Sequence, residues 1–130
     1  MKSIIIVLTA LFIGGTVVAD TVGVATFYTV ASCKEERWGD RQPLTASGRP
    51  LNDSIMGCAL PGRPAKWGEK WLVTNTNTGK SITVEQWDIG PNRHCIVEHG
   101  VVIDLTLQAF LNLGGNVKDG KIAVKIERVK

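Results

Sequence analysis

The chain has 130 residues and a formal net charge of +3, from 15 Lys and Arg against 12 Asp and Glu. The basic residues are scattered and form no run interleaved with aromatic residues, which argues against a nucleic-acid-binding protein. The length fits one modest hydrophobic core and is too short for a catalytic domain joined to a second binding module. We therefore expect one domain with no nucleic-acid partner.

Residues 1–19 have the pattern of a secretory signal peptide. Lys2 gives a positive start, an apolar run extends from Ile4 to Ile13, and small residues precede a cleavage site at Ala19. The alternative is a membrane anchor, because the segment after Lys2 is uncharged, but it is shorter than the ~20 residues of a spanning helix. We expect a secreted protein, extracellular or periplasmic, with no stable membrane anchor after cleavage and a mature domain of residues 20–130.

The mature part begins with a strand and a long loop. Residues 22–30 are rich in β-branched and aromatic side chains, which predicts a strand. Residues 31–52 are polar and punctuated by Gly and Pro, which predicts a long loop that is functional or pinned by a disulfide.

The next segment of the sequence predicts a β-hairpin followed by a second loop. Strands are predicted at 71–76 and 81–87, joined by a tight turn at 77–80. Residues 89–100 form another irregular loop.

The chain then closes on a strand, a helix and a last strand. Residues 101–105 are apolar and predict a strand, after which Thr106 can cap a short helix over 107–113. In residues 121–129 apolar and polar side chains largely alternate, which predicts a last strand at the edge of a sheet or closing a barrel. Short strands, long ordered loops and one or two short helices predict an all-β fold, a small barrel of six strands.

Three cysteines lie in the mature part, where an oxidising compartment favours disulfides. With Cys33, Cys58 and Cys95, one bridge leaves one cysteine over, and three pairings are open. His94 and His99 flank Cys95, but the chain has no CxxC pair, so we expect no metal site and no other cofactor.

Two aspartates are candidates for acid–base chemistry. Asp88 and Asp104 both lie in apolar stretches at or near strand ends, where burial raises the pKa of a carboxyl group toward values useful for proton donation. The alternative is structural, because Asp104 precedes the helix at Thr106 and an acidic residue there favours the helix N-terminus. The residues alone leave both interpretations open.

A series of short motifs gives the chain a family resemblance. In order they are GVATFYT (23–29), LTASG (44–48), ALP (59–61), VTNTNTGKSITV (73–84), DIGP (88–91) and IDLT (103–106). This order resembles double-psi β-barrels of the rare lipoprotein A type. Residues 103–130 also look like the end of the first domain of bacterial expansins, so the resemblance covers nearly the whole mature chain.

The resemblance implies a groove across the barrel that binds a β-linked polysaccharide. Asp104 matches the groove aspartate that expansins require and that double-psi endoglucanases use as general acid. Asp88 matches the aspartate of the D-x-G-P motif, which in the lipoprotein type is associated with cleavage of peptidoglycan strands. Thr26 and Tyr28 are groove candidates by resemblance, with a core or sheet-surface role as the alternative.

Tryptophans and cysteines add further candidates. Trp38 and Trp67 lie in loops and could line the groove, because aromatic faces stack on sugar rings; Trp71 and Trp87 lie in strands, where a core position is expected. Cys33 and Cys95 each follow a strand that should end at the groove, so we favour this pair for the disulfide.

The chain also departs from the family patterns. Arg49 stands where the lipoprotein type has an acidic residue, Cys58 stands near the place of its histidine, and Gly90 replaces an aromatic of expansins. The sixteen residues from Asp88 to Asp104 exceed the spacing of the lipoprotein type by roughly five.

Three functions follow as hypotheses. The first is a secreted protein that binds and remodels a cell-wall polysaccharide such as peptidoglycan, cellulose or pectin, by lytic transglycosylase-like or glycoside hydrolase-like cleavage if it is an enzyme. The second is a non-catalytic expansin-like or carbohydrate-binding module. The third is a barwin-like defence or inhibitor protein, although such families are richer in cysteine. We expect a monomer.

Overall fold

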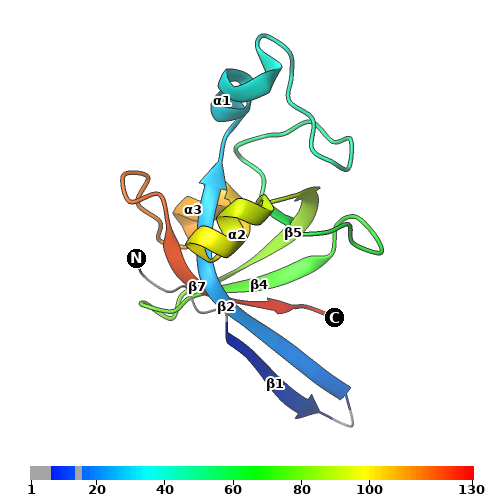
Figure 1. The fold of residues 1–130 in the computed structure, drawn as a ribbon, viewed down its shortest axis with the longest axis vertical. Helices are drawn as coiled ribbons and strands as arrows, with labels where there is room; N and C mark the ends of the chain where they lie inside the picture. The colour runs from blue at the N-terminus through cyan, green and yellow to red at the C-terminus, as the bar shows by residue number, and fades with distance from the viewer. Residues whose placement is uncertain (1–6, 14–15) are drawn as a thin grey trace.

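A computed structural model describes residues 7–13 and 16–130, with side chains from Thr21 onward. Its strands are β1 (Val7–Ile13), β2 (Thr16–Tyr28), β3 (Gly57–Leu60), β4 (Lys70–Asn75), β5 (Ser81–Ile89), β6 (Val101–Thr106) and β7 (Ile122–Arg128). Its helices are α1 (Val30–Cys33), the π-helix η1 (Lys34–Trp38), α2 (Arg93–His99) and α3 (Leu107–Asn112) (Figure 1).

Six strands close into a barrel. They follow the order β2-β6-β3-β5-β4-β7, and β7 pairs back to β2 to complete the ring, while β1 pairs with β2 outside it. The β2–β6 and β3–β5 pairs are parallel, and the other four pairs of the ring are antiparallel. The predicted all-β fold with a six-stranded barrel is confirmed.

Apolar side chains from every barrel strand and from α3 fill the barrel. The most deeply buried include Val73, Val84, Ile103, Leu105, Phe110, Leu113 and Val124. The ring of Phe110 packs on that of Phe27, with centroids 4.6 Å apart. The predicted helix after Thr106 is therefore part of the core, because its apolar face closes over the strands.

Two segments predicted as loops contain helices. Thr29 caps α1 through a reciprocal pair of hydrogen bonds with Ser32, and η1 follows without a break. Asn92 caps α2 by accepting a hydrogen bond from the backbone N–H of Cys95, and Gly100 ends it with φ at 65°. Both helices are short and carry no buried residue, so no apolar periodicity marked them in the sequence.

The sequence prediction also omitted β3. This strand has only four residues, all buried, and pairs with both β5 and β6. A short, wholly buried strand shows no alternation of polar and apolar residues, so the pattern used for the other strands could not detect it.

The predicted signal peptide stays a prediction. Residues 1–6 and 14–15 of that segment lie outside the described residues. Among the residues that the structure describes, no helix has the length and apolar character needed to cross a membrane.

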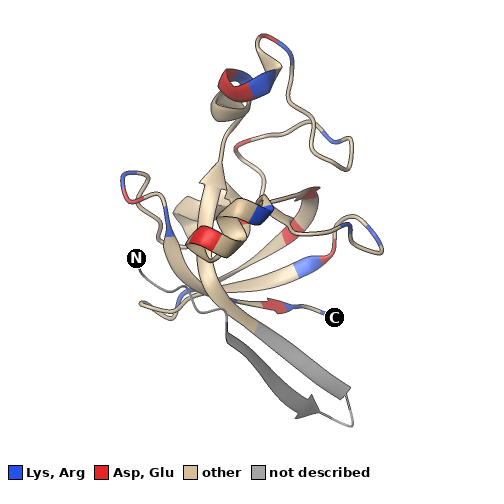
Figure 2. Ribbon diagram, viewed as in Figure 1, with Lys and Arg blue, Asp and Glu red and all other residues tan. Residues whose placement is uncertain are grey.

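Basic and acidic residues are interspersed along the ribbon (Figure 2). Lys and Arg lie near Asp and Glu on several loops, and the α1–η1 segment carries both signs.

Candidate functional site

Two adjoining hollows bring most of the candidate residues together. They measure about 570 and 400 Å³ and share five lining residues, Tyr28, Cys33, Glu36, Asp88 and Ile89. The smaller hollow also contains Thr26, Asp104 and Cys95, and the larger contains Trp38. We call the two together the groove.

Asp104 lies on β6 at the floor of the groove. It pairs in register with Thr26 of the parallel strand β2, and the Thr26 hydroxyl donates a 3.0 Å hydrogen bond to its Oδ1. Burial raises the pKa of Asp104 to about 6; the Thr26 hydrogen bond opposes this rise, and the negative charges of Asp88 and Glu36 add to it. A carboxyl group with such a pKa is protonated in a large fraction of molecules at weakly acidic pH and can act there as a proton donor.

Asp88 lies near the end of β5 and is held by the backbone. Its Oδ1 accepts hydrogen bonds from the backbone N–H of Ala46, at 2.8 Å, and of Ile89, at 2.9 Å. Ala46 belongs to the LTASG motif, so this bond brings two of the sequence motifs together. The loop thereby fixes the Asp88 carboxylate beside the groove.

Tyr28 and Thr26 reach the groove from the same face of β2. They are two residues apart, so their side chains point to one side of the strand. Burial raises the pKa of Tyr28 well above its usual value, and the charges of Asp88 and Asp104 raise it further. The phenol therefore stays protonated and is a hydrogen-bond donor beside the two carboxyl groups.

Glu36 is a groove residue that the sequence analysis missed. It lies on η1 and lines both hollows, as Cys33 does. The two residues are three apart, which places them on one helical face, but residues 31–52 were predicted to be a loop. The capping pattern of Thr29 and Ser32 was the available signal for a helix here.

The loop tryptophans have different positions. Trp38 lines the larger hollow and lies beneath the guanidinium groups of Arg37 and Arg41, at 5.8 and 5.2 Å from its ring centroid. Trp67 does not line the groove and instead lies under Arg63, at 5.4 Å. Of the two loop tryptophans, only Trp38 is placed for stacking on a groove ligand.

The strand tryptophans are both only partly buried. Trp71 packs against the core from its edge, while Trp87 lies outside the core cluster, under the guanidinium of Arg49 at 4.1 Å. Arg49 lines a separate hollow, so position 49 contributes no side chain to the groove.

The cysteines are all free thiols in the structure, so the expected Cys33–Cys95 disulfide is not formed in it. Cys33 and Cys95 nevertheless line the same hollow, from α1 and α2. Cys58 is buried on β3, and burial raises the pKa of its thiol. Among the described residues, no three His, Cys, Asp or Glu side chains are arranged to hold a metal ion.

No protein-family model matches the chain, and no curated protein matches its sequence.

Proposed function

We propose that this protein is a secreted double-psi β-barrel that binds and remodels a cell-wall polysaccharide, with Asp104 as the proton donor. The single observation that carries the proposal is that Asp104 and Asp88 both line one open groove. The parallel β2–β6 and β3–β5 pairs of the closed barrel are compatible with a double-psi topology. The ordered motifs of the lipoprotein and expansin types point the same way.

The chemistry follows from the two carboxyl groups and their neighbours. Asp104, in the fraction of molecules that carry its proton, donates this proton to the glycosidic oxygen as the bond breaks. In a lytic transglycosylase the sugar's own hydroxyl is the nucleophile, so one acid–base group is sufficient. Asp88 stabilises the positive charge that develops on the sugar, or serves as the second carboxyl of a hydrolase.

A second candidate function, binding without cleavage, is favoured by the position of Arg49. The guanidinium packs on Trp87 and Arg49 lines a separate hollow, so this chain has no carboxylate at the place where the lipoprotein type has one. A groove of this kind would bind a wall polymer and loosen it.

The experiment is to incubate the mature protein with purified peptidoglycan and, separately, with cellulose. Pull-down measures binding, and mass analysis of the soluble products measures cleavage. Anhydro-sugar ends would establish transglycosylase chemistry, whereas binding without products would establish the second candidate. Absence of both would contradict the proposal.

A matched pair of variants assigns the chemistry to the groove. Asp104→Asn keeps the shape of the side chain but cannot donate a carboxyl proton, so products should fall by at least about 100-fold. Asp119→Asn makes the same chemical change on an exposed loop outside the groove and should leave product formation unchanged. If both variants keep full activity, Asp104 is not the acid.

A further inference from the structure

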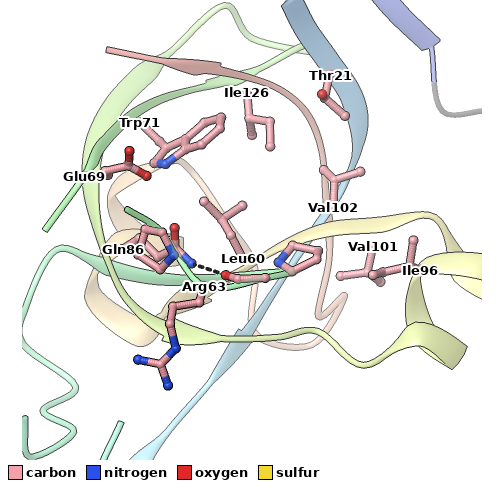
Figure 3. Close-up of a pocket in the computed structure, with 13 residues that line it drawn as sticks. Thr21, Leu60, Arg63, Glu69, Trp71, Gln86, Ile96, Val101, Val102 and Ile126 are labelled. Atoms are coloured by element: carbon pink, nitrogen blue, oxygen red, sulfur yellow. Dashed lines mark hydrogen bonds between the residues drawn. The ribbon is translucent and has the colours of Figure 1, made fainter. Parts of the chain in front are cut away.

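A second cavity lies apart from the two carboxyl groups. Its volume is about 390 Å³, within the range of small-molecule sites, and it opens between the barrel and the loop after β3 (Figure 3). Most of its wall is apolar, formed by Leu60, Trp71, Ile96, Val101, Val102 and Ile126. We call it the Trp71 cavity.

Two polar atoms on the lining of this cavity have no hydrogen-bond partner among the described residues. The indole Nε1 of Trp71 is buried and donates no hydrogen bond. Gln86 is 3% exposed; its Nε2 donates to the carbonyls of Gly62 and Asp88, and within the described residues no donor reaches its Oε1. In Figure 3 the indole nitrogen lies above the Gln86 carboxamide on the same side of the cavity.

An unsatisfied buried donor lowers the stability of the fold unless a ligand or water pairs with it. Trp71 of β4 pairs with Val84, and Gln86 lies two residues further along β5, so the two side chains are diagonal neighbours on one face of the sheet. A donor and an acceptor placed in this way match a group that can both accept and donate. A hydroxyl group does both, whereas a carbonyl only accepts and an ammonium only donates.

The charges around the cavity argue for a neutral ligand. Glu69 forms an ion pair with Arg128, and the Arg63 guanidinium packs over the ring of Trp67. Each charged group of the lining therefore already has a favourable contact. The apolar wall suits the flat faces of a ring, and the polar pair suits a hydroxyl on the edge of that ring.

We propose that the Trp71 cavity is a second binding site, for a neutral pyranose unit with a hydroxyl that accepts from the Trp71 indole N–H and donates to Gln86 Oε1. The site is separate from the acid–base chemistry of the groove. Because the indole nitrogen is buried, the ring must enter the cavity rather than rest on its rim.

The test is an NMR titration of the indole N–H signals of the four tryptophans with methyl β-glucoside and methyl β-N-acetylglucosaminide. We expect the Trp71 signal to shift saturably with at least one of the two sugars. Trp71→Phe keeps a flat ring but removes the donor, and should weaken binding at least tenfold, measured on the signals of Ile96 and Val102. Trp67→Phe, the matched control outside the cavity lining, should bind as the unaltered protein does.

Each result bears on one proposal or the other. Sugar shifts confined to the groove, or no shifts at all, would overturn the second site, and the polysaccharide pull-down would still decide the function of the groove. If Trp71→Phe binds the sugars as tightly as the unaltered protein, the proposed hydrogen bond from the indole N–H to a sugar hydroxyl is wrong. A water molecule would then be the partner of the indole N–H. Asp104→Asn should bind the sugars in the cavity normally, because the groove carboxyl does not line it.

Discussion

The pKa of Asp104 depends on one neighbouring hydroxyl. The Thr26 hydrogen bond lowers this pKa against the larger effect of burial. Thr26→Val should therefore raise the pKa of Asp104 above about 6, while Thr26→Ser, which keeps the hydroxyl, should leave it near 6. Carboxyl ¹³C NMR titration measures the value directly, and an equal pKa in both variants would show that the bond has no effect on Asp104.

The same carboxyl group should make stability depend on pH. The pKa of Asp104 is raised from 3.8 to about 6 by folding, so the native state binds this proton more tightly than the unfolded chain does. The free energy of unfolding should therefore fall by up to about 3 kcal/mol as pH rises from about 4 to about 6. Urea unfolding of the wild type and Asp104→Asn at pH 4 and pH 7 gives the difference, and the variant should lack this fall. A difference that does not change with pH would contradict the raised pKa.

At the level of residues, the motifs were more informative than the single side chains. Asp88, Asp104, Thr26 and Tyr28 occupy strand positions, and regular strand geometry brings them to one groove. Glu36 reaches the groove only because residues 30–38 are helical, and this depends on a local cap. The cavity pair of Trp71 and Gln86 lies on adjacent strands, and no sequence pattern shows that two polar atoms will be left unpaired.

The segment that leads into β3 is hydrogen-bonded on both sides of Met56 to the buried hydroxyl of Thr106. Thr106 donates a 2.6 Å hydrogen bond to the carbonyl of Ile55 and accepts one from the N–H of Gly57. Thr106→Val leaves both backbone groups unpaired and should lower the free energy of unfolding by about 1–3 kcal/mol. Thr76→Val removes an exposed hydrogen bond to Ala123 and should cost less than about 0.5 kcal/mol. Thermal and urea unfolding compare the two, and equal losses would contradict the special role of Thr106.

The α1 and α2 helices carry the two cysteines for which a disulfide is still predicted. Cys58 is 1% exposed, so Cys33 and Cys95 are the accessible pair on a common hollow. Oxidation by glutathione disulfide would remove two protons and two electrons from these thiols and release two glutathione molecules. Both thiols are free in the structure.

Mass spectrometry with peptide mapping tests this disulfide. On oxidation the protein should lose about 2 Da, the mass of two hydrogens. The Cys58→Ser variant should show the same loss, and the Cys33→Ser variant should show none. A bridge that includes Cys58, or three free thiols after oxidation, would refute it.

The elements that the sequence predicted are those with a clear period or turn. The hairpin of β4 and β5, the strand β6 and the helix α3 each agree with their predicted ranges to within about two residues. The helix α2 and the strand β3 are defined mainly by capping and tertiary contact. Capping residues in Gly- and Pro-rich segments favour turns as strongly as helices, so the sequence pattern did not distinguish the helix α2 from a turn.

The architecture of the whole molecule depends on its last strand. β7 pairs with β2 on one side and β4 on the other, and it supplies Ile122, Val124 and Ile126 to the core. Deletion of residues 121–130 should open the ring, expose two strand edges and abolish cooperative unfolding. Circular dichroism melting and light scattering measure the loss of cooperativity and the resulting association; a cooperative, monomeric truncated protein would contradict the closed barrel.

The partners of β2 also have a kinetic consequence. β2 is the first barrel strand along the chain, but its neighbours in the ring, β6 and β7, both lie beyond residue 100. No ring contact of β2 can therefore form before β6 has been synthesised, and the long loops to be closed place folding in the slow, millisecond-to-second regime. A chain with this order of strands can close its barrel only once β7 is available, whereas the hairpin of β4 and β5 can form before β2 has any partner in the ring.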